Sequence, residues 1–319
     1  MLKAGFIGAG NRSQGAHYPN VQRLEEDVEM LAVCELDEDR LDQVATKYEF
    51  PHTYTDHRKM LDEADPDIVY CVMNEKWILQ PALDCLNAGK HMFIEKPPGK
   101  NSDETQQLLD AAVANDVYCM VGFQRRHTAI TREAMRLVND KGPVSTVVTT
   151  FNKQILGGDG KELTTTLWND IVHIVDLTRF MAGGEPVEVT AYQDKFSGDS
   201  YNHYSALVRF DNHVTGIIMG NRASGGRVLR SELHGPGIGC YMKIPAELEI
   251  LEDNQSRVLG GWEIEGVDKE DTASYEGALD MHRHFIDCIH NKKVPTSDLR
   301  DAIHSIRLVD QIEATDWRS

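Results

Sequence analysis

The sequence predicts an α/β protein in two parts: an N-terminal doubly wound parallel sheet and a C-terminal α/β domain with a large open, mostly antiparallel sheet. Up to about residue 122, short apolar runs alternate with longer amphipathic ones, a pattern typical of parallel strands connected by helices. From Val144 onward the runs lengthen and alternate apolar with polar residues, which indicates a sheet with one covered face. We therefore expect one domain at 1–122 and a second at 123–319.

The first domain is expected to contain short buried strands separated by amphipathic helices. The expected strands are Leu2–Ile7, Met30–Val33, Ile68–Val72, His91–Ile94 and Tyr118–Val121, and the expected helices are Glu38–Lys47, Lys76–Asn87 and Asp103–Asn115. Ser102 precedes the last of these helices and is expected to be its N-cap.

The second domain is expected to begin in the loop FQRRH, with a helix to about Asp140. Strands follow at 144–152, 187–193, 204–210, 213–221, 227–235 and 247–251. Two helices, Tyr275–His290 and Asp298–Thr315, are expected to close the chain.

The composition excludes several classes of partner. The 319 residues include 33 Lys and Arg and 51 Asp and Glu. The resulting net charge of -18 repels nucleic acid and anionic membrane surfaces. The six cysteines have no metal-ligand spacing, so we expect reduced, buried thiols and no metal site. No targeting segment or bilayer-length apolar run is recognisable, so a cytoplasmic location is expected.

A glycine-rich loop, Gly8-Ala9-Gly10-Asn11-Arg12-Ser13, follows the first strand directly. In a dinucleotide-binding fold, the first glycine makes the tight turn and the second lets the backbone approach the pyrophosphate. The third glycine of that pattern is Ser13 here, so the match is partial. A plain strand-to-helix turn is the alternative interpretation.

The second strand ends at Glu35, where a carboxylate accepts hydrogen bonds from the ribose hydroxyls in NAD-binding proteins. Such a carboxylate repels the 2'-phosphate of NADP, so NAD is the expected cofactor and NADP is less favoured. Two alternatives stay open: Glu35 is part of a solvated acidic run, or Arg12 and Arg40 accept a 2'-phosphate.

The segment FIEKPPGK places Glu95 and Lys96 immediately after a buried strand, followed by two prolines. Ligands of doubly wound sheets bind beyond the carboxyl ends of the strands, so Lys96 is expected at the edge of the cofactor. A lysine there can hydrogen-bond the reacting oxygen, and the prolines restrict its backbone. The alternative is an ordinary exposed Glu-Lys pair before a proline turn.

These motifs resemble the Gfo/Idh/MocA family, named for glucose-fructose oxidoreductase and inositol dehydrogenase. The resemblance is carried by GFIGAGNRSQGAH, AGKHMFIEKPPG, VGFQRRH and WNDIVHIVDLTRF, which occur in the family's order along nearly the whole chain. It implies a Rossmann domain, a substrate-binding and oligomerisation α/β domain, and NAD(P)-dependent oxidation or reduction of sugars, polyols and related compounds. It also implies a homodimer or homotetramer, with Lys96 as the catalytic lysine. The cofactor-binding residues it implies are Gly8, Gly10, Asn11, Arg12, Ser13, Glu35, Asn74, Glu95, Lys96, Gln124 and Arg125.

The segment around His173 carries the other expected catalytic groups. Asn169, His173 and Asp176 fall within roughly 60° on a helix of about 100° per residue. The resemblance implies that His173 takes the hydroxyl proton. The family's usual acid position is Asn169 here, and the acid has moved to Asp170, which is expected to orient His173 or bind a substrate hydroxyl. An ordinary amphipathic helix with a solvated face is the alternative.

Five further expectations concern residues of other segments and of the His173 helix. Trp168 and Asn169 are expected to join Lys96, Asp170 and His173 in binding the substrate, and Asp176 is expected to be structural. Trp77 replaces a histidine usual in the family; it either stacks beside a ring or, as we favour, fills the core. Two alternatives are open for Arg125, Arg126 and His127. Their side chains are expected either to reach the cofactor or substrate, or to form a solvated basic loop. His282 and His284 are two residues apart on an expected helix, so their side chains point in different directions and we expect no shared metal ion.

The expected function is therefore NAD-dependent hydride transfer at a hydroxyl-bearing carbon of a sugar, polyol or sugar acid. One alternative is a glycosidase or epimerase that oxidises its substrate transiently and returns the hydride. Another is a nicotinamide-binding sensor without catalysis.

Overall fold

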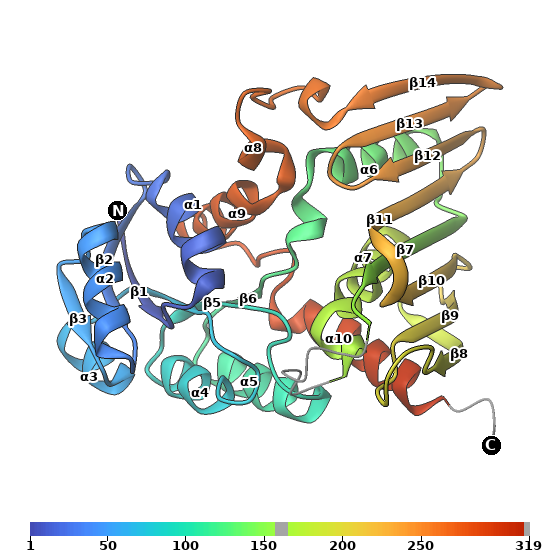
Figure 1. The fold of residues 1–319 in the computed structure, drawn as a ribbon. Coiled ribbons are helices and arrows are strands. Elements are labelled where there is room, and N and C mark those ends of the chain that lie inside the picture. The colour runs from blue at the N-terminus through green and yellow to red at the C-terminus, as the bar shows by residue number, and fades with distance from the viewer. Residues whose placement is uncertain (157–164, 316–319) are drawn as a thin grey trace. The chain divides into compact units, whose positions relative to one another are not determined.

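The computed structural model describes residues 1–156 and 165–315 and divides the chain into two compact units (Figure 1). The first unit comprises Met1–Gly122 with Ala278–Ile303, and the second comprises the described residues of Phe123–Gly277 and His304–Ser319. The first unit therefore includes a C-terminal segment beyond the expected 1–122. The roles expected for the two domains stay predictions.

The first unit is built on a parallel sheet in the order β3-β2-β1-β4-β5-β6. The strands are β1 (Leu2–Ile7), β2 (Val28–Cys34), β3 (His52–Tyr54), β4 (Ile68–Cys71), β5 (His91–Ile94) and β6 (Cys119–Val121). The chain leaves β1 towards β2 and β3, then returns to β4 on the other side of β1. Ligands of such sheets bind at the point where the strand order reverses.

Helices connect these strands, as the alternating pattern predicts. They are α1 (Tyr18–Gln22), α2 (Glu38–Tyr48), α3 (His57–Glu63), α4 (Leu79–Asn87) and α5 (Ser102–Ala114). The short elements β3 and α3 were not expected. The N-cap of α5 is Asn101 and not Ser102, because the Asn101 side chain accepts a hydrogen bond of 2.9 Å from the Glu104 amide.

The segment after Gly277 joins the first unit through α9 (Ala278–His290) and the turn that follows it. Rings of α9 pack against the sheet, with Phe285 lying 5.8 Å from Tyr70 between centroids. Asp298 Oδ2 then accepts the Cys119 amide at 2.9 Å, which ties the turn to the edge strand β6. These contacts explain why a late segment belongs with the N-terminal sheet.

The second unit contains a sheet in the order β14-β13-β12-β11-β7-β10-β9-β8, in which β7 and β10 are parallel and the other neighbours antiparallel. Its strands are β7 (Thr146–Gln154), β8 (Pro186–Asp194), β9 (His203–Phe210), β10 (Thr215–Asn221), β11 (Ala223–Gly235), β12 (Ile238–Lys243), β13 (Glu247–Glu252) and β14 (Gln255–Gly260). The large, mostly antiparallel sheet is as expected, although β12 and β14 were missed.

One face of this sheet is covered by α6 (Ala129–Lys141) and α7 (Val172–Ala182). Glycines on β10 allow α7 to approach closely: a Cβ at Gly220 would overlap the side chain of Ile171, and one at Gly216 would lie 2.9 Å from Thr178 Cγ2. The close approach holds the start of α7 against the ends of β7 and β10.

The C-terminal helical region differs from the prediction at its start and at Gly277. The expected helix Tyr275–His290 is broken into α8 (Thr272–Glu276) and α9 by Gly277, whose φ of 85° lies in the left-handed region. A Cβ there would lie 2.7 Å from the backbone of His127. The last helix, α10 (Leu299–Ala314), agrees with the prediction to within one residue at each end.

Among the helices of residues 1–156 and 165–315, none has the length and apolarity needed to cross a bilayer.

Candidate active site

The glycine loop has the backbone geometry that a dinucleotide site requires. Gly8 has a φ of 97°, and a Cβ on it would overlap the carbonyl of Val72, so only glycine fits there. Gly10 borders open space within 4 Å of its Cβ position, which leaves room for a pyrophosphate to approach. Ser13, in place of the third glycine, donates a hydrogen bond of 2.7 Å to the Gly8 carbonyl. The Ser13 side chain therefore links the end of the loop to its first glycine.

Two of the segments singled out for function, the one after the glycine loop and the one before His173, contain a π-helical turn. One spans Ser13–His17 after the glycine loop, and the other spans Leu167–Ile171 before α7. Such turns account for well under 1% of residues and occur frequently at functional sites. Hydrophobic periodicity gives no signal for them, so the sequence did not predict them.

Glu35 lies at the end of β2 and faces the glycine loop. Its Oε2 accepts the amide of Ala9 at 2.9 Å, and its Oε1 accepts the amide of Leu36 at 2.8 Å. Arg40 is 3.4 Å from the same carboxylate. Glu35 is thus part of the loop structure and not a solvated member of an acidic run. Its role as a ribose ligand stays a prediction.

Glu95 joins the strand end to the glycine loop. Its Oε1 accepts hydrogen bonds from Arg12 Nε at 2.7 Å and from His17 Nε2 at 2.9 Å. Its Oε2 accepts the backbone amide of Lys96 at 2.9 Å. Glu95 therefore fixes the start of the turn that carries Lys96 relative to the loop.

The ionisation of this centre follows from its burial and its charges. Burial alone would raise the pKa of Glu95, but the hydrogen bond from His17 and the positive charges of Arg12 and Lys96 hold that pKa well below its ordinary value. Burial lowers the pKa of His17, although Glu95 opposes the shift. The hydrogen bond and the nearby cations therefore favour the ionised form of Glu95, and burial disfavours the protonated form of His17.

His17 extends the centre inward to α9. Its Nδ1 lies 3.1 Å from Nε2 of His282, and both imidazoles are completely buried. Phe93 lies 5.0 Å from the His282 ring between centroids. No role was expected for His17, although it ends the motif GFIGAGNRSQGAH. No local pattern could show that it contacts a residue so distant in the chain.

Lys96 lies at the carboxyl end of β5 and is half-buried. The Lys96–Pro97 peptide bond is cis. Asn74, in the turn after β4, accepts the Lys76 amide through its side chain at 3.0 Å. Trp77 does not fill the core as expected: it is 61% exposed, with the Lys76 ammonium 4.6 Å from its ring centroid.

Asp170 is surrounded by cations in the second unit. Its carboxylate lies 2.8 Å from Lys153 Nζ and 2.9 Å from an Arg222 guanidinium nitrogen. Asp170 and Arg222 are buried. Asp170 was expected to orient His173 or bind substrate, and its ion pairs with β7 and the β10–β11 connection were not foreseen. The available signal was Lys153 itself, which follows Val147, Thr149 and Phe151 at alternate positions on the covered face.

His173 follows Asp170 by one turn, at the start of α7. It is half-buried on a helix whose other residues, apart from Phe180, are buried. The helix is therefore not an amphipathic helix with a solvated face. Asp176 is enclosed with Arg126 in an ion pair and accepts the Ser305 hydroxyl at 2.8 Å, which fits the structural role expected for it.

Asn11, in the glycine loop of the first unit, is exposed. The other expected residues lie in the second unit. Gln124 donates to the Glu276 carbonyl at 2.9 Å, and Arg125 is half-buried in the same 3-10 turn. The turn is not a solvated basic loop, because Arg126 and His127 are also buried. Trp168 is buried and donates to Glu313 at 2.9 Å, and Asn169 is half-buried. Their cofactor and substrate contacts stay predictions.

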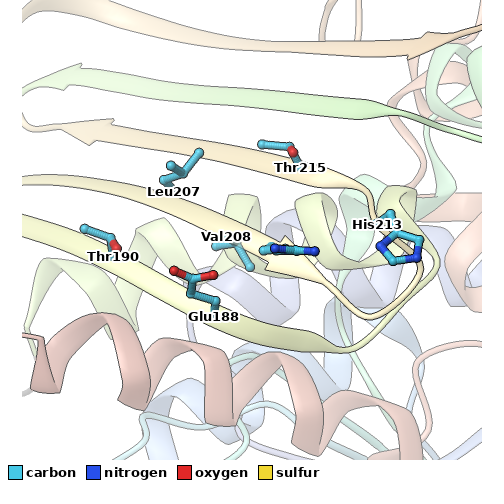
Figure 2. Close-up of a pocket in the computed structure, with 7 residues that line it drawn as sticks. Glu188, Thr190, Leu207, Val208, His213 and Thr215 are labelled. Atoms are coloured by element: carbon cyan, nitrogen blue, oxygen red, sulfur yellow. The ribbon is translucent and has the colours of Figure 1, made fainter.

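A surface groove of about 350 Å³ lies elsewhere in this unit (Figure 2). Residues of β8, β9 and β10 line it, and none of the expected site residues is among them. Its lining residues are Glu188, Thr190, Leu207, Val208, Arg209, His213 and Thr215. Within the described parts of the chain, no cluster of three or more His, Cys, Asp or Glu residues has the arrangement of a metal site.

The fold and the loop geometry define a Rossmann-type dinucleotide-binding protein: the left-handed Gly8, the open space at Gly10 and the carboxylate after β2 fit such a cofactor. The chain belongs to the Gfo/Idh/MocA oxidoreductase family. Residues 2–123 match the family described as oxidoreductase family, NAD-binding Rossmann fold, and residues 142–237 match the GFO/IDH/MocA C-terminal domain.

Individual relatives are distant. The uncharacterized oxidoreductase YrbE of Bacillus subtilis is 27% identical over 60% of this chain and 57% of its own length. Alpha-N-acetylgalactosaminidase of Shewanella oneidensis is 31% identical over 38% of this chain and 28% of its own length. The chain thus spans little more than half of the first relative and less than a third of the second.

A solved structure of levoglucosan dehydrogenase in complex with NADH and levoglucosan superposes with a TM-score of 0.87 over 98% of this chain and 96% of that chain. The two sequences are 17% identical, so this likeness shows a shared fold.

Proposed function

We propose that the protein is an NAD-dependent oxidoreductase that transfers a hydride from a hydroxyl-bearing carbon of a sugar, polyol or sugar acid. The observation that carries the proposal is the Arg12–Glu95 ion pair of 2.7 Å, which connects the glycine loop to the residue before Lys96. A half-buried lysine held beside a dinucleotide loop has the position needed to act on a substrate oxygen. Family membership supports the oxidoreductase class.

Lys96 and His173 have separate roles in the proposed reaction. Bound nicotinamide supplies a hydride acceptor at its ring carbon C4. The Lys96 ammonium donates a hydrogen bond to the substrate oxygen and stabilises negative charge that develops on it. The His173 imidazole takes the hydroxyl proton as the carbon–hydrogen bond breaks, so the products are a carbonyl compound, a reduced cofactor and a protonated histidine.

NAD is the proposed cofactor because Glu35 presents a carboxylate at the end of β2. A 2'-phosphate would meet that negative charge, whereas a ribose hydroxyl can donate to it. Arg40, 3.4 Å from Glu35, is already engaged with this carboxylate. NADP is therefore the less favoured cofactor.

The first experiment mixes the purified protein and NAD with myo-inositol, D-glucitol, D-glucose, D-gluconate and aryl glycosides. Reduced-nicotinamide absorbance and product mass are both recorded. We expect NADH to accumulate with a product lighter by two hydrogens. If none of these compounds reduces the cofactor in a protein that binds NAD, the dehydrogenase assignment is wrong.

Lys96→Met is the matched test of the catalytic lysine. We expect kcat to fall about 10²- to 10⁴-fold, the usual contribution of a positioned proton-donating group, with NAD affinity nearly unchanged. Lys100→Met is the control, because Lys100 is exposed and pairs with Glu104 at 3.3 Å. Equal turnover of the Lys96→Met and Lys100→Met proteins would contradict the scheme.

A second candidate function is a glycosidase that borrows the hydride and returns it. The likeness to the Shewanella alpha-N-acetylgalactosaminidase favours it, as does the engagement of Asp170 with two cations, which separates this acid from a simple dehydrogenase proton relay. Cleavage of an aryl glycoside that requires NAD but leaves no NADH would identify this reaction.

We also propose a homodimer or homotetramer formed through the outer face of the second unit's sheet. Large apolar side chains on that sheet are exposed: Tyr192, Leu207, Ile217, Met219, Leu251 and Val258. The groove of Figure 2 lies among these strands, and Leu207 lines it. Light scattering of the purified protein tests this, and a monomeric mass would refute it.

A further inference from the structure

His17 has no role in the proposed reaction, although its side chain is polar and completely buried. It ends the π-helical turn Ser13–His17, in which the Tyr18 amide donates to the Ser13 carbonyl. Turns of this kind occur frequently at functional sites. A buried polar side chain is costly unless its hydrogen-bonding groups are satisfied, so the partners of His17 indicate what it does.

Both ring nitrogens of His17 have a partner within hydrogen-bond distance. Nε2 lies 2.9 Å from Glu95 Oε1, and Nδ1 lies 3.1 Å from Nε2 of His282. An ionised carboxylate only accepts hydrogen bonds, so Nε2 of His17 carries a proton. In the neutral ring, which burial favours, Nδ1 accepts and Nε2 of His282 donates to it. The hydrogen bonds therefore run in one direction, from His282 through His17 to Glu95.

The hydrogen bond from His17 fixes the orientation of the Glu95 carboxylate. Oε1 accepts from His17 and Arg12, and Oε2 accepts the backbone amide of Lys96 at 2.9 Å. The Arg12 side chain is 45% exposed, whereas that of His17 is enclosed. An exposed arginine is held less firmly than an enclosed ring, because it keeps more conformational freedom and contact with water. His17 is therefore the firmer of the two groups that hold Oε1.

The His17 ring also packs against the strand that carries Glu95. Its centroid lies 5.4 Å from that of Phe93 on β5, and the His282 centroid lies 5.0 Å from the same ring. Phe93 is completely buried. His17 therefore contacts the end of β5 twice, through the ring of Phe93 and the carboxylate of Glu95, immediately before Lys96.

His17 also affects the charge beside Lys96. Burial raises the pKa of Glu95, and the hydrogen bond from His17 is the largest of the influences that lower it. The positive charge of Lys96 is another of these influences, so the two side chains act on each other. An ionised Glu95 favours the ammonium form of Lys96, which is the form that donates to a substrate oxygen.

We propose that His17 is a positioning residue for the catalytic lysine: it acts through Glu95 and fixes the turn that contains Lys96. This inference rests on the proposed function, because that function assigns the catalytic role to Lys96. His282 supports the same arrangement, since its donation to Nδ1 holds the His17 ring in the orientation that donates to Glu95.

His17→Phe and His17→Gln are the decisive pair of variants. Phenylalanine keeps a ring to pack against Phe93 but removes both nitrogens, whereas glutamine keeps an N–H donor for Glu95. On whichever of myo-inositol, D-glucitol, D-glucose and D-gluconate reduces NAD, we expect kcat of His17→Phe to fall about 10- to 100-fold, the cost of a small misplacement of a catalytic group. The KM for NAD should change little. His17→Gln should turn over at close to the wild-type rate.

His91→Phe is the matched control. His91 is a half-buried histidine at the amino end of β5, with its ring stacked 5.4 Å from that of Tyr118 and its Nδ1 accepting the Tyr118 amide at 3.0 Å. Its replacement should lower stability without changing kcat, because it lies at the opposite end of the strand from Lys96. Equal losses of kcat in His17→Phe and His91→Phe would show that His17 has only a structural role.

Exchange of the Lys96 amide hydrogen with solvent tests the positioning without turnover. In protein labelled with ¹⁵N-lysine, the Lys96 signal is the one missing from Lys96→Met. We expect this amide to exchange up to about tenfold faster in His17→Phe than in the wild type, because its acceptor is no longer fixed, and at close to the wild-type rate in His17→Gln. Equal exchange in His17→Phe and the wild type would overturn the inference.

If His17→Phe fails to fold, His17→Asn replaces it in both measurements. The amide of asparagine corresponds in position to Nδ1 and not to Nε2, so it does not restore the donor to Glu95. His17→Asn should therefore show the slower turnover and faster exchange, and His17→Gln should not. Identical behaviour of the two amide variants would refute the inference.

The outcomes separate this inference from the proposed function. If the wild type reduces no NAD with any of the four compounds, the oxidoreductase proposal fails, and the exchange rates still decide whether His17 positions Lys96. A wild-type kcat in His17→Phe, in a protein that does reduce NAD, would support the oxidoreductase and refute the inference.

Discussion

Two buried carboxylates, Glu95 in the first unit and Asp170 in the second, each contact two basic side chains, yet they join different kinds of segment. Glu95 accepts hydrogen bonds from Arg12 and His17 and from the backbone amide of Lys96. Asp170 pairs with Lys153 on β7 and with Arg222 after β10. The first carboxylate therefore holds the glycine loop against the turn that carries Lys96, whereas the second holds the turn before α7 against the sheet.

Removal of the Glu95 side chain should have the largest effect. Glu95→Ala leaves Arg12 and His17 without their shared acceptor and opens a cavity. Glu95 is buried but the Arg12 side chain is 45% exposed and can be solvated, so we expect a decrease of about 1–3 kcal/mol in the free energy of unfolding, the usual cost of losing a buried hydrogen-bond partner. Urea denaturation measures it, with the exposed Glu38→Ala as control. A loss within about 0.5 kcal/mol, typical of surface sites, would show that Glu95 is not structural.

Asp170→Asn should have a smaller effect, because asparagine keeps the shape of the side chain and loses only the charge that Lys153 and Arg222 contact. We expect a decrease of about 1–2 kcal/mol in the free energy of unfolding, the usual cost of weakening hydrogen bonds to charged groups. Urea denaturation measures it, again with Glu38→Ala as control. A free energy of unfolding equal to that of the wild type would show that these ion pairs do not stabilise the protein.

Acidification should destabilise the Glu95 centre through His17. Burial lowers the pKa of His17, so the folded state holds its proton less well than the unfolded state does. The stabilisation is complete above the unfolded pKa of about 6.5 and is lost as the pH falls below it. Each pH step of one below that value removes at most about 1.4 kcal/mol, until the folded pKa is reached.

Denaturation at about pH 7.5, 6.5 and 5.5, values that bracket the ordinary histidine pKa, measures this loss. His17→Gln should lose less stability over this interval than the wild type, while His290→Gln, at an exposed position, should follow the wild type. Parallel curves for all three proteins would exclude His17 as the cause.

Glu35→Gln should give the smallest effect. It removes the charge that opposes a 2'-phosphate while keeping an acceptor for the Ala9 amide. We expect the ratio of NADP to NAD affinity to rise by up to about tenfold, equivalent to about 1.4 kcal/mol. Fluorescence titration with both reduced cofactors measures the ratio, and an unchanged ratio would mean that Glu35 does not select the cofactor.

Helices and strands with a strong hydrophobic periodicity could be predicted from the sequence. The strands Leu2–Ile7 and His91–Ile94 agree with the structure residue by residue, because they are mostly apolar runs bounded by turns. The short elements β3 and α3 were missed because three residues, or seven, carry little periodicity. The long helix expected at 275–290 failed at Gly277, whose left-handed φ no propensity argument foresees.

The identity of the main site residues could be predicted from the sequence, but the contacts between them could not. Lys96 and His173 were predicted from motifs that resemble those of the family. The partners of Glu95 and Asp170 could not be predicted in this way, since Arg12 and Glu95 are 83 residues apart, and Lys153 and Asp170 belong to different elements. Pairings of this range depend on sheet order and helix packing, which no local pattern specifies.

The most direct test of the central claim follows a carbon-bound deuterium through a single turnover. Enzyme in excess is mixed with NAD and with carbon-deuterated gluconate or glucitol, and the nicotinamide is analysed by mass spectrometry. The account predicts that deuterium appears on the nicotinamide in the wild type and that its transfer is greatly slowed in Lys96→Met. An unlabelled nicotinamide in a protein that binds NAD and converts the substrate would contradict it.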